Sequence, residues 1–575
     1  MNNNRENWFQ SVFLNSWRPF FWIAAVIFLV YCSTLFYNIV YLDDNVLVVG
    51  HYQFNKNLSN IFQAFNEDIF RTSLGGGSFY RPILRLSFMF DAQFSEEAVV
   101  FMSHFSNLVL HIFSACLFFL LLLKLNIKKE IALFLSLIFG VHPLTAQTVS
   151  FIAGRNDSLL AIFVFPIIMF FLDFLETKRM KYYVWHLIFF GLALFTKETA
   201  AILPFLCAAF ILIFVNPKKI IADLKQCAYL LAGWGSVGIF WFLARREVLH
   251  NFIGNADYDV LLSIYRNFPA LLPAIGKIIL PFDLSVFPVM KDMMMIYGII
   301  SLILLAVWFI LAKNKNYRLI IFGTAWFFLF ISLTLIKPMD TTPEFSENRI
   351  YLPMLGFAFI FLGLGKIKFW EKFNNITQKK ILLGISAALM ITLSFVTIYR
   401  NKYYKDKLSF WNNAVSTSPS FAFNHNNLGA MFFLDGEKDE AEKEFNKALE
   451  INPKERMAHN NLGLVYMEKG EFDKADEEFN KELEINPYYD NAYANKGLLY
   501  YRMGKMEEAV DSWKKTLEVN PGYSQALYNL FIYYYQNQDK ENAKYWAEEA
   551  QNRGIPLLPE MQKMLNPLDS IILNK

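Results

Sequence analysis

The sequence predicts an all-α protein in two parts, a polytopic membrane domain followed by a polar array of helical repeats. Hydrophobic residues make up 55% of the 575 residues and charged residues only 18%, whereas a soluble globular chain carries about a quarter charged residues. Before Arg400 the apolar residues gather in runs of about twenty, the length of a membrane-spanning helix. Beyond Arg400 the sequence is polar and repeats with a fixed period. These three observations together indicate the two-part architecture.

Charge and cysteine content argue against two other classes of protein. The net charge is +3, and the basic residues occur in short clusters between apolar runs, which does not favour nucleic-acid binding. Cys32, Cys116, Cys207 and Cys227 lie in or beside apolar segments, without the spacing of metal ligands. We therefore expect neither a disulfide framework nor a zinc site.

Eleven apolar runs are candidates for membrane-spanning helices. The first run exceeds the apolar core of a signal peptide and no small-residue cleavage site follows it, so we interpret it as a retained signal anchor. The fifth and sixth runs are interrupted only by Lys197 and Glu198, and an alternative is one broken helix or a re-entrant pair. The runs lie at residues 20–40, 98–123, 130–148, 157–176, 183–196, 199–216, 226–243, 293–313, 317–336, 349–365 and 381–399.

Basic residues cluster in alternate loops between the runs, which predicts that these loops face the cytoplasm. The N-terminus, with Arg5 and Arg18, is then cytoplasmic, and an odd number of passes brings everything after Arg400 to the opposite side. The connection at 41–97 becomes an extracytoplasmic loop, and the proline-, glycine- and lysine-containing stretch at 271–281 a re-entrant or interfacial segment. The basic clusters are Lys124, Lys128 and Lys129; Lys178, Arg179 and Lys181; Lys218 and Lys219; Lys313, Lys315 and Arg318; and Lys366, Lys368, Lys379 and Lys380.

The polar part of the chain repeats every 34 residues, which is the period of tetratricopeptide arrays. Small residues recur where paired helices must approach closely, and glycines separate the two helices of each unit. The fourth unit departs from the pattern at Phe531 and Gln538, as expected of a terminal cap. The repeated positions are Pro419, Pro453, Pro487 and Pro521; Gly429, Gly463 and Gly497; Ala441, Ala475, Ala509 and Ala543; and the turn glycines Gly436, Gly470 and Gly504.

Rows of asparagine in the repeats are candidates for binding an acceptor. Such arrays bind peptides or proteins on a concave face, and asparagine amides can clamp an extended backbone. In the other interpretation the asparagines are solvated or cap local turns, and the sequence leaves both open. The rows consist of Asn426 and Asn460 and of the offset set Asn427, Asn461, Asn495 and Asn529.

The predicted domain boundaries follow from these patterns. Residues 1–400 form the membrane domain and residues 401–416 a linker. Residues 417–556 form the repeat domain of about four units, and residues 557–575 a C-terminal tail.

Four polar clusters fall in loops assigned to the outer side. A charge that drops into the hydrocarbon costs on the order of 3 kcal/mol, so such groups tend to face one another or a wet cavity. An acidic pair that ends a helix is usually a solvated stop signal, but convergence of four clusters on one side favours a chemical role. The clusters are Tyr41-Leu42-Asp43-Asp44-Asn45, whose loop also carries Arg71, Gly75-Gly76-Gly77 and Tyr80-Arg81-Pro82; Val141-His142-Pro143 with Arg155-Asn156-Asp157; Lys197-Glu198; and Glu347-Asn348-Arg349-Ile350-Tyr351-Leu352-Pro353.

The same motifs carry a resemblance to a known family. They are Leu42-Asp43-Asp44, Phe79-Tyr80-Arg81-Pro82, His142-Pro143 followed by Gly154-Arg155-Asn156-Asp157, Thr196-Lys197-Glu198, and Glu347 to Pro353 ahead of the repeats. In these marks, and in their order along nearly the whole chain, the sequence resembles the transmembrane and tetratricopeptide-repeat protein O-mannosyltransferases, members of the C-type glycosyltransferase superfold. Eukaryotic members carry longer repeat arrays than the four units present here.

The resemblance implies transfer of a mannose-like hexose from a polyprenyl-phosphate carrier to an acceptor hydroxyl on the outer face, with inversion by direct displacement. Asp43 or Asp44 is then the general base, with Asp43 favoured, while its neighbour orients the hydroxyl and raises the pKa of the base by repulsion. Cations must stabilise the departing phosphate. The implied phosphate contacts are Arg81, Arg155, Lys197 and Arg349, with His142 as a hydrogen-bond donor, and the supporting residues are Tyr80, Asp157, Glu198 and Glu347.

The expected partners are the lipid-linked sugar and a protein acceptor. This mechanism requires no metal because side chains supply the positive charge, although Asp43, Asp44, Asp157 and Glu347 could hold one. The membrane is the plasma membrane in a prokaryote or the endoplasmic reticulum in a eukaryote, and the lack of a retention signal favours the prokaryotic one.

Each assignment has an alternative that the sequence leaves open. Snorkelling to lipid headgroups alone accounts for Arg81 or Arg349. Lys197 and Glu198 could form a structural ion pair between two short helices. The alternative for the whole chain is a non-catalytic scaffold, whose spans only anchor the repeats for assembly of envelope or secreted proteins.

Overall fold

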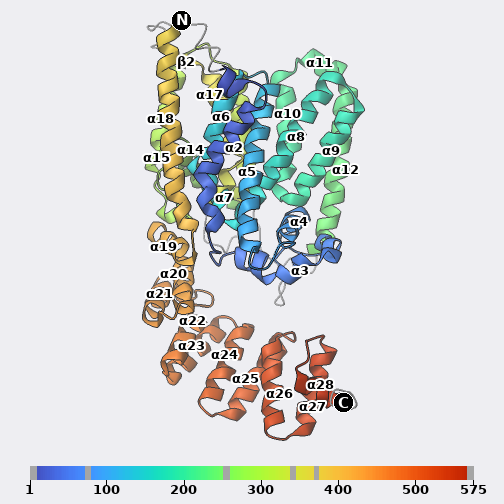
Figure 1. The fold of residues 1–575 in the computed structure, drawn as a ribbon, viewed down its shortest axis with the longest axis vertical. Coiled ribbons are helices and arrows are strands. Elements are labelled where there is room, and N and C mark those ends of the chain that lie inside the picture. The colour runs from blue at the N-terminus through green and yellow to red at the C-terminus, as the bar shows by residue number, and fades with distance from the viewer. Residues whose placement is uncertain (1–9, 71–78, 250–259, 337–344, 368–374, 566–575) are drawn as a thin grey trace. The chain divides into compact units, whose positions relative to one another are not determined.

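The chain forms two compact units in the computed structural model, one ending at Ser418 and the other beginning at Pro419. Nearly all of the regular structure is helical, as Figure 1 shows. In the described residues the only strand pairing joins β1 (Ala312–Lys313) to β2 (Lys366–Ile367). The all-α prediction is confirmed. The structure describes residues 10–70, 79–249, 260–336, 345–367 and 375–565.

Every predicted apolar run forms a helix, but the predicted count of about eleven spans is not confirmed. Within the described residues six helices are long and apolar enough to cross a membrane, and a bent pair around His142 makes up to seven. Four shorter apolar helices account for the remaining runs. The six are Arg18–Phe36, Val99–Lys124, Ile152–Thr177, Leu224–Leu249, Tyr317–Leu335 and Lys380–Tyr404; the bent pair is Lys129–Val141 with Pro143–Ser150; and the shorter helices are Met180–Thr196, Glu198–Phe214, Ile296–Leu311 and Leu355–Leu364.

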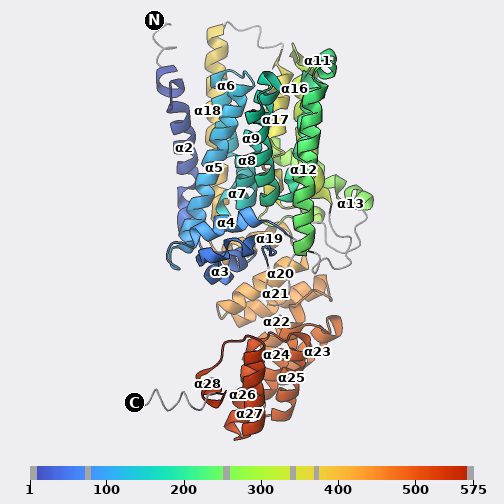
Figure 2. The same cartoon turned by 90° about the vertical axis from the view of Figure 1, so that its right-hand side faces the viewer.

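The helices of the membrane unit run side by side in Figures 1 and 2. The helices formed by the apolar runs are α2 (Arg18–Tyr31), α5 (Val99–Lys124), α6 (Lys129–Val141), α8 (Arg155–Thr177), α9 (Met180–Thr196), α10 (Leu203–Phe214), α12 (Leu224–Leu249), α15 (Ile296–Leu311), α16 (Tyr317–Ser332), α17 (Leu355–Leu364) and α18 (Asn375–Asn401). Shorter helices connect them: α3 (Tyr52–Lys56), α4 (Pro82–Asp91), α7 (Ala146–Ser150), α11 (Pro217–Ala222), α13 (Val260–Asn267), α14 (Leu271–Ile279) and α19 (Lys407–Thr417).

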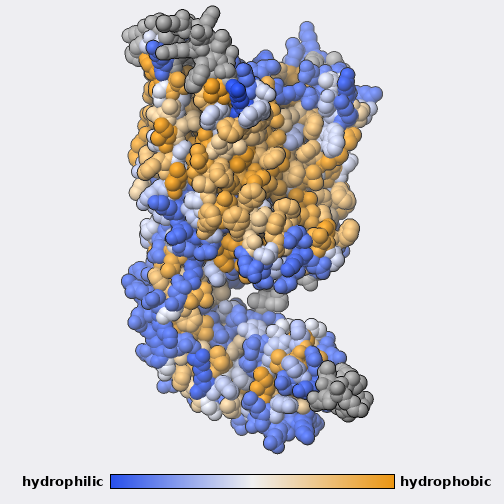
Figure 3. Space-filling view, in the orientation of Figure 1, coloured by the Kyte–Doolittle hydropathy of each residue, from blue (hydrophilic) through white to orange (hydrophobic). Residues whose placement is uncertain are grey.

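An apolar belt covers the membrane unit on the face shown in Figure 3, with hydrophilic bands above and below it. The outer helices carry much of this surface, since only 17% of the apolar window of α12 and 11% of that of α18 is buried. Exposed apolar patches of this extent mark contact with a membrane or a partner. The belt therefore agrees with a multi-pass membrane unit.

Polar and basic loops lie at opposite ends of the membrane unit. Figures 1 and 2 show α3 and α4 at one end and α11 and β2 at the other. Two ion pairs, Lys124 with Asp173 and Lys178 with Asp223, join the basic loops to helices at the α11 end. The basic and the polar loops alternate along the sequence and lie at opposite ends of the membrane unit.

Residues 401–416, expected to be a linker, instead belong to the membrane unit. They continue α18 into a 3-10 helix at Lys402–Tyr404 and then into α19. The indole of Trp411 in α19 is fully buried, and its Nε1 donates a hydrogen bond to the carbonyl of Val40 at 2.9 Å. Burial of this aromatic face fixes α19 beside the loop that carries Asp43 and Asp44.

The second unit is a stack of helix pairs, as the 34-residue period predicts. Gly436, Gly470 and Gly504 all have positive φ between the paired helices, and so does Gln538 at the equivalent position of the fourth pair. The predicted turn positions are therefore correct, including the non-glycine one. The pairs are α20 (Ala422–Leu434) with α21 (Lys438–Ile451), α22 (Ala458–Lys469) with α23 (Phe472–Ile485), α24 (Asp490–Arg502) with α25 (Met506–Val519), and α26 (Ser524–Gln536) with α27 (Lys540–Asn552).

The C-terminal end of this unit extends further than predicted. Residues 557–575 were expected to form a tail, but α28 (Pro559–Leu565) packs on the last repeat. Met561 is fully buried in the same core cluster as Trp513 and Phe531. The helix covers an apolar surface that would otherwise be exposed at the end of the array. Residues 566–575 lie outside the described residues.

A tight helix crossing in the membrane unit provides a test of the packing. Gly323 of α16 and Gly356 of α17 face each other so closely that a Cβ on either would clash with the other's carbonyl oxygen. We expect Gly356→Ala to lower the free energy of unfolding by about 1–3 kcal/mol through overpacking. The measurement is the thermal unfolding temperature of the purified protein in detergent. Gly384→Ala in α18, where nothing lies within 4 Å, is the matched control. Equal effects of the two substitutions would contradict the close crossing.

Candidate active site

Asp44 is a structural part of the turn that follows the first span. Its carboxylate is 1% exposed and accepts hydrogen bonds from the backbone N–H groups of Val40 at 2.7 Å, Leu42 at 3.2 Å and Asn45 at 3.0 Å. Burial raises the pKa of Asp44 to about 6, although these hydrogen bonds act in the opposite direction. Its oxygens hold the turn, so the structure does not present this carboxylate to a substrate.

Asp43 differs from Asp44 in that it is half-buried, and its charge acts on Arg81. Burial lowers the pKa of Arg81, but attraction by Glu198, Asp157 and Asp43 outweighs burial, so this pKa lies above its ordinary value. The charge of Asp43 therefore acts on the same arginine as two carboxylates that are distant in the sequence. Asp43 belongs to the turn that Asp44 stabilises.

We call Arg81, Asp157, Lys197, Glu198 and Asn348 the polar cluster. The Arg81 guanidinium donates from Nε to Glu198 Oε2 at 3.0 Å and from Nη2 to Oε1 at 2.5 Å. It also stacks on the ring of Phe79, with its central carbon 4.4 Å from the ring centroid. This two-point pairing leaves Nη1 outside the ion pair and fixes the direction in which it points.

Lys197 connects Asp157 to the break between α9 and the 3-10 helix η8 (Glu198–Ile202). The backbone of Lys197 is extended, which ends α9 and supports two helices rather than one continuous helix at this point. The Nζ of Lys197 donates to Asp157 Oδ1 at 2.6 Å and to Asn156 Oδ1 at 3.1 Å. The amide of Asn348 donates to the other oxygen, Asp157 Oδ2, at 3.1 Å. Three segments far apart in the sequence thus meet on one carboxylate.

Two further predicted residues lie beside the polar cluster. Tyr80 is buried, and its ring packs edge-on against Phe195 with centroids 5.9 Å apart. Arg349 is half-buried and directly follows Asn348. Both are therefore close to the cluster through their neighbours in the sequence.

His142 does not offer a hydrogen bond to a ligand in this structure. Its Nδ1 accepts from the N–H of Leu144 at 3.2 Å, and its Nε2 lies 3.1 Å from the carbonyl of Ile278, to which it donates. Both ring nitrogens are therefore used to cap the 3-10 turn Pro143–Thr145 and to hold α14. The prediction that His142 contacts phosphate does not agree with these contacts.

Arg155 is fully buried and paired inside the membrane unit. Its Nη2 lies 2.6 Å from Asp91 Oδ2, in α4, and its Nε donates to Asn107 Oδ1 at 2.8 Å. Nη1 donates to the carbonyl of Ser87 and Nη2 to that of Ser103. The predicted phosphate role does not agree with this arrangement, because every nitrogen of the guanidinium has a protein partner.

Glu347 is likewise a structural centre, because both of its carboxylate oxygens are bound within the protein. Its Oε1 accepts from Lys277 Nζ at 2.5 Å and from the N–H of Ser285 at 3.0 Å, and its Oε2 pairs with Arg400. Arg400 also donates to the carbonyl of Pro143 at 2.7 Å. Glu347 therefore ties the motif of residues 347–353 to α14 and to the end of α18.

Sequence reasoning missed Asp91, Lys277 and Arg400 as partners. A signal was present, since Lys277 is a lysine within an apolar stretch and Arg400 ends the last apolar run. A buried basic residue needs a carboxylate partner, which was the available clue. The identity of that partner depends on the tertiary fold.

The asparagine rows of the repeat unit are largely used within the array. Asn461 Nδ2 donates to Asn426 Oδ1 at 3.0 Å, and Asn495 Nδ2 donates to Asn460 Oδ1 at 2.8 Å. These bonds link neighbouring repeats, and Asn426 and Asn460 are buried. Acceptor binding by the rows stays a prediction. The remaining members also have local partners, Asn427 with the carbonyl of Phe423 and Asn529 with Gln525.

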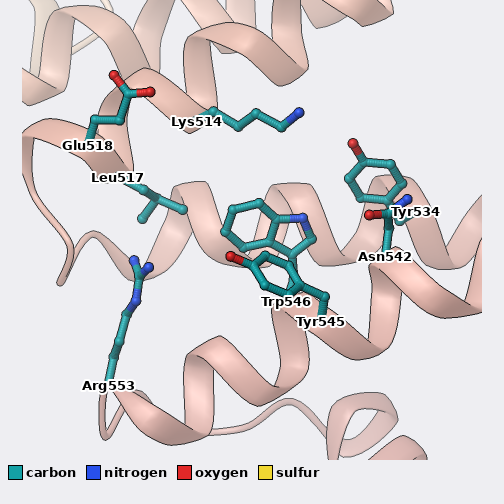
Figure 4. Close-up of a pocket in the computed structure, with 8 residues that line it drawn as sticks. All are labelled: Lys514, Leu517, Glu518, Tyr534, Asn542, Tyr545, Trp546 and Arg553. Atoms are coloured by element: carbon teal, nitrogen blue, oxygen red, sulfur yellow. The ribbon is translucent and has the colours of Figure 1, made fainter.

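A pocket of about 490 Å³ lies in the repeat unit between α25, α26 and α27, and Figure 4 shows the rings of Trp546 and Tyr545 at its centre. The asparagine rows do not contribute to it. This pocket is also separate from the polar cluster, which belongs to the other unit. Its lining residues are Lys514, Leu517, Glu518, Tyr534, Asn542, Tyr545, Trp546 and Arg553.

The carboxylates that were considered for a metal site do not come together. Asp157 binds Lys197, Glu347 binds Lys277 and Arg400, and Asp44 binds backbone amides. Within the part of the chain that the structure describes, no three His, Cys, Asp or Glu side chains are grouped to hold a metal ion. Metal independence stays a prediction.

Comparison with known proteins matches the family that the motifs resemble. Residues 83–241 match the family described as dolichyl-phosphate-mannose-protein mannosyltransferase, and residues 422–455, 457–489 and 491–523 match tetratricopeptide repeats. A protein O-mannosyl-transferase of Caenorhabditis elegans is 22% identical over 407 residues. The match covers 67% of this chain and spans 56% of that relative's length.

Solved structures are similar to about a quarter of the chain. MamA from Desulfovibrio magneticus is 18% identical, with a TM-score of 0.23, over 28% of this chain and 86% of that one. YrrB, described as a TPR protein with an unusual peptide-binding site, is 22% identical, with a TM-score of 0.23, over 28% of this chain and 81% of that one.

The buried pair of Arg155 and Asp91 can be tested apart from any role in catalysis. We expect Arg155→Gln or Asp91→Asn to lower the free energy of unfolding by about 3–5 kcal/mol, because each leaves an unpaired buried charge. Thermal unfolding of the purified variants in detergent measures the loss. The double variant Arg155→Met with Asp91→Leu, which removes both charges, should recover part of it. A normally stable Arg155→Gln variant would contradict the structural role.

Proposed function

We propose that this protein is a membrane glycosyltransferase that moves a mannose-like hexose from a polyprenyl-phosphate donor to a hydroxyl of a protein acceptor. The observation that carries the proposal is the polar cluster at one end of the membrane unit, in which carboxylates hold Arg81 and Lys197 and the charge of Asp43 acts on Arg81. A base and positive charges at one place suit acyl or glycosyl transfer equally. The match of residues 83–241 to a mannosyltransferase family favours glycosyl transfer.

In the proposed reaction Asp43 accepts the proton of the acceptor hydroxyl as its oxygen attacks the anomeric carbon. The bond between that carbon and the phosphate oxygen breaks, and its electron pair leaves with the phosphate. Attack from the face opposite the leaving group inverts the anomeric carbon. Asp43 suits the role of base better than Asp44, because the Asp44 carboxylate is buried and bound to three backbone N–H groups.

Arg81, Lys197 and Arg349 are the proposed contacts of the leaving phosphate. Glu198 holds Arg81 by two of its nitrogens, and Asp157 holds Lys197, so the protein fixes both cations before a donor binds. Fixed charges stabilise a developing negative charge without reorganisation during the reaction. Glu198 and Asp157 are therefore positioning residues in this proposal, as is Asn348, which donates to Asp157.

We assign the polar end of the membrane unit to the extracytoplasmic side. The loops at the opposite end are basic, and basic loops favour the cytoplasm. The chain leaves the membrane unit through α19, which is hydrogen-bonded through Trp411 to the loop of Asp43 and Asp44. The repeats therefore begin on the side where transfer is proposed, which suits recruitment of a protein acceptor.

The pair of acidic residues provides the direct test. We expect Asp43→Asn to lower kcat by about 10²–10⁴, because the amide cannot accept the hydroxyl proton. Asp44→Asn should instead lower stability by about 1–3 kcal/mol, because it disturbs the hydrogen bonds of a buried turn. Transfer of mannose from a polyprenyl-phosphate donor to a peptide, together with thermal unfolding, measures both effects. Full activity of Asp43→Asn would overturn the assignment of the base.

The function as a whole is tested in cells. We expect glycopeptides from secreted proteins to lose a hexose when the gene is deleted, and the loss to be restored by the wild-type chain but not by Asp43→Asn. Mass spectrometry of intact glycopeptides is the measurement. A scaffold without activity would keep its partners in the Asp43→Asn variant and leave the glycopeptides unchanged by that substitution.

A further inference from the structure

A row of aromatic rings connects the lipid-facing side of α12 with the polar cluster. The ring of Phe195, near the end of α9, lies 6.2 Å from that of Phe240 in α12. It also lies 5.9 Å from Tyr80 and 6.0 Å from Phe65 on the loop side, measured between centroids. We call Phe240, Phe195, Tyr80 and Phe65 the aromatic row. Its members come from the first loop (Phe65 and Tyr80), from α9 (Phe195) and from α12 (Phe240).

The outer end of the aromatic row faces the apolar belt. Phe240 is 65% exposed and lies within α12, one of the six helices long and apolar enough to cross a membrane. Figures 1 and 2 show α12 on the outside of the unit and Figure 1 shows α9 beside it. An exposed ring at this position is in contact with hydrocarbon rather than water.

The inner end of the aromatic row adjoins the cations. Tyr80 directly precedes Arg81, and Phe195 lies two residues before Lys197. Both rings are at least half-buried, whereas Phe240 is exposed. Ring contacts therefore run from the exposed Phe240 through Phe195 to Tyr80, the residue next to Arg81 in the sequence.

We propose that the aromatic row binds the isoprenoid chain of the lipid donor, a role that rests on the proposed function. A lipid-linked phosphate is amphipathic, so its phosphate must reach the cations while its chain stays in apolar surroundings. In the row, the first isoprenoid units contact Tyr80 and Phe195 next to the phosphate, and later units contact Phe240.

The size of the effect follows from the surroundings. An isoprenoid chain in the bilayer is already out of water, so the hydrophobic effect contributes little to its binding by the aromatic row. The row acts through close packing. Each ring packs against the chain through many atom pairs whose weak attractions add up. The loss of one ring should therefore change donor affinity several-fold and leave the chemical step unchanged.

The test compares donors that share the mannosyl phosphate head group and differ in the length of the isoprenoid chain. Full-length protein in liposomes is assayed with mannosyl phosphates carrying the short geranyl chain or the long undecaprenyl chain. We expect Phe240→Ala to raise KM for the undecaprenyl donor by about three- to tenfold, with kcat unchanged, and to leave KM for the geranyl donor unaltered. Phe195→Leu, which keeps a branched apolar side chain at a packed position, should raise KM for both donors.

Phe242→Ala is the matched control, because this residue is on the same helix and 53% exposed but two positions further along, on another side of α12. It should leave KM for both donors unchanged. The inference is overturned if Phe240→Ala changes KM for both donors equally or for neither, or if Phe242→Ala has the same effect. If the wild-type protein uses only the undecaprenyl donor, KM for that donor is compared between Phe240→Ala and Phe242→Ala. A higher KM for Phe240→Ala alone supports the inference, and equal KM values overturn it.

A wild-type protein that transfers sugar from neither donor would refute the proposed function, and the inference with it. Active wild type with no difference between the two α12 variants would refute only the inference. Thermal unfolding of each variant separates these outcomes from a loss of fold.

Discussion

The membrane unit depends on the pairing of buried charges at its polar end. A lone ion in the hydrocarbon is costly, and five buried basic side chains here have a carboxylate partner: Arg81 with Glu198, Lys197 with Asp157, Arg155 with Asp91, and both Lys277 and Arg400 with Glu347. Arg85, also buried, donates instead to the backbone carbonyls of Asp68 and Ile69. Each pair joins segments that are distant in sequence. The pairs therefore decide which loops meet, and the polar cluster is one result of that arrangement.

These pairs divide the polar motifs of the sequence into two groups with different surroundings. Arg155 and Glu347 have partners for every charged atom and hold helices together. Arg81 and Lys197 are also paired, but both belong to the polar cluster, and the charge of the half-buried Asp43 acts on Arg81. A motif of several residues can thus combine a structural member with one at the site, as Arg155 and Asp157 do two positions apart.

The sequence predicts architecture better than it predicts contacts. Hydropathy locates every apolar helix, and the period of 34 locates each repeat turn, because both are local properties. The linker prediction for residues 401–416 was wrong, since Trp411 is buried by a loop almost 400 residues away and no local pattern reveals that partner. The same reason explains why His142 and Arg155 looked like ligands. Their hydrogen-bond partners exist only once the chain has folded.

The attachment of α19 to the first loop has a consequence for biosynthesis and for engineering. The N–H of Asn38 donates to the carbonyl of Lys405, so the N-terminal loop gains its last supports from residues made after the final membrane helix. During translation that loop must wait for about two thirds of the chain to be made. A chimera that exchanges repeat arrays should for the same reason be joined at Pro419, since a junction at residue 400 would discard part of the membrane unit.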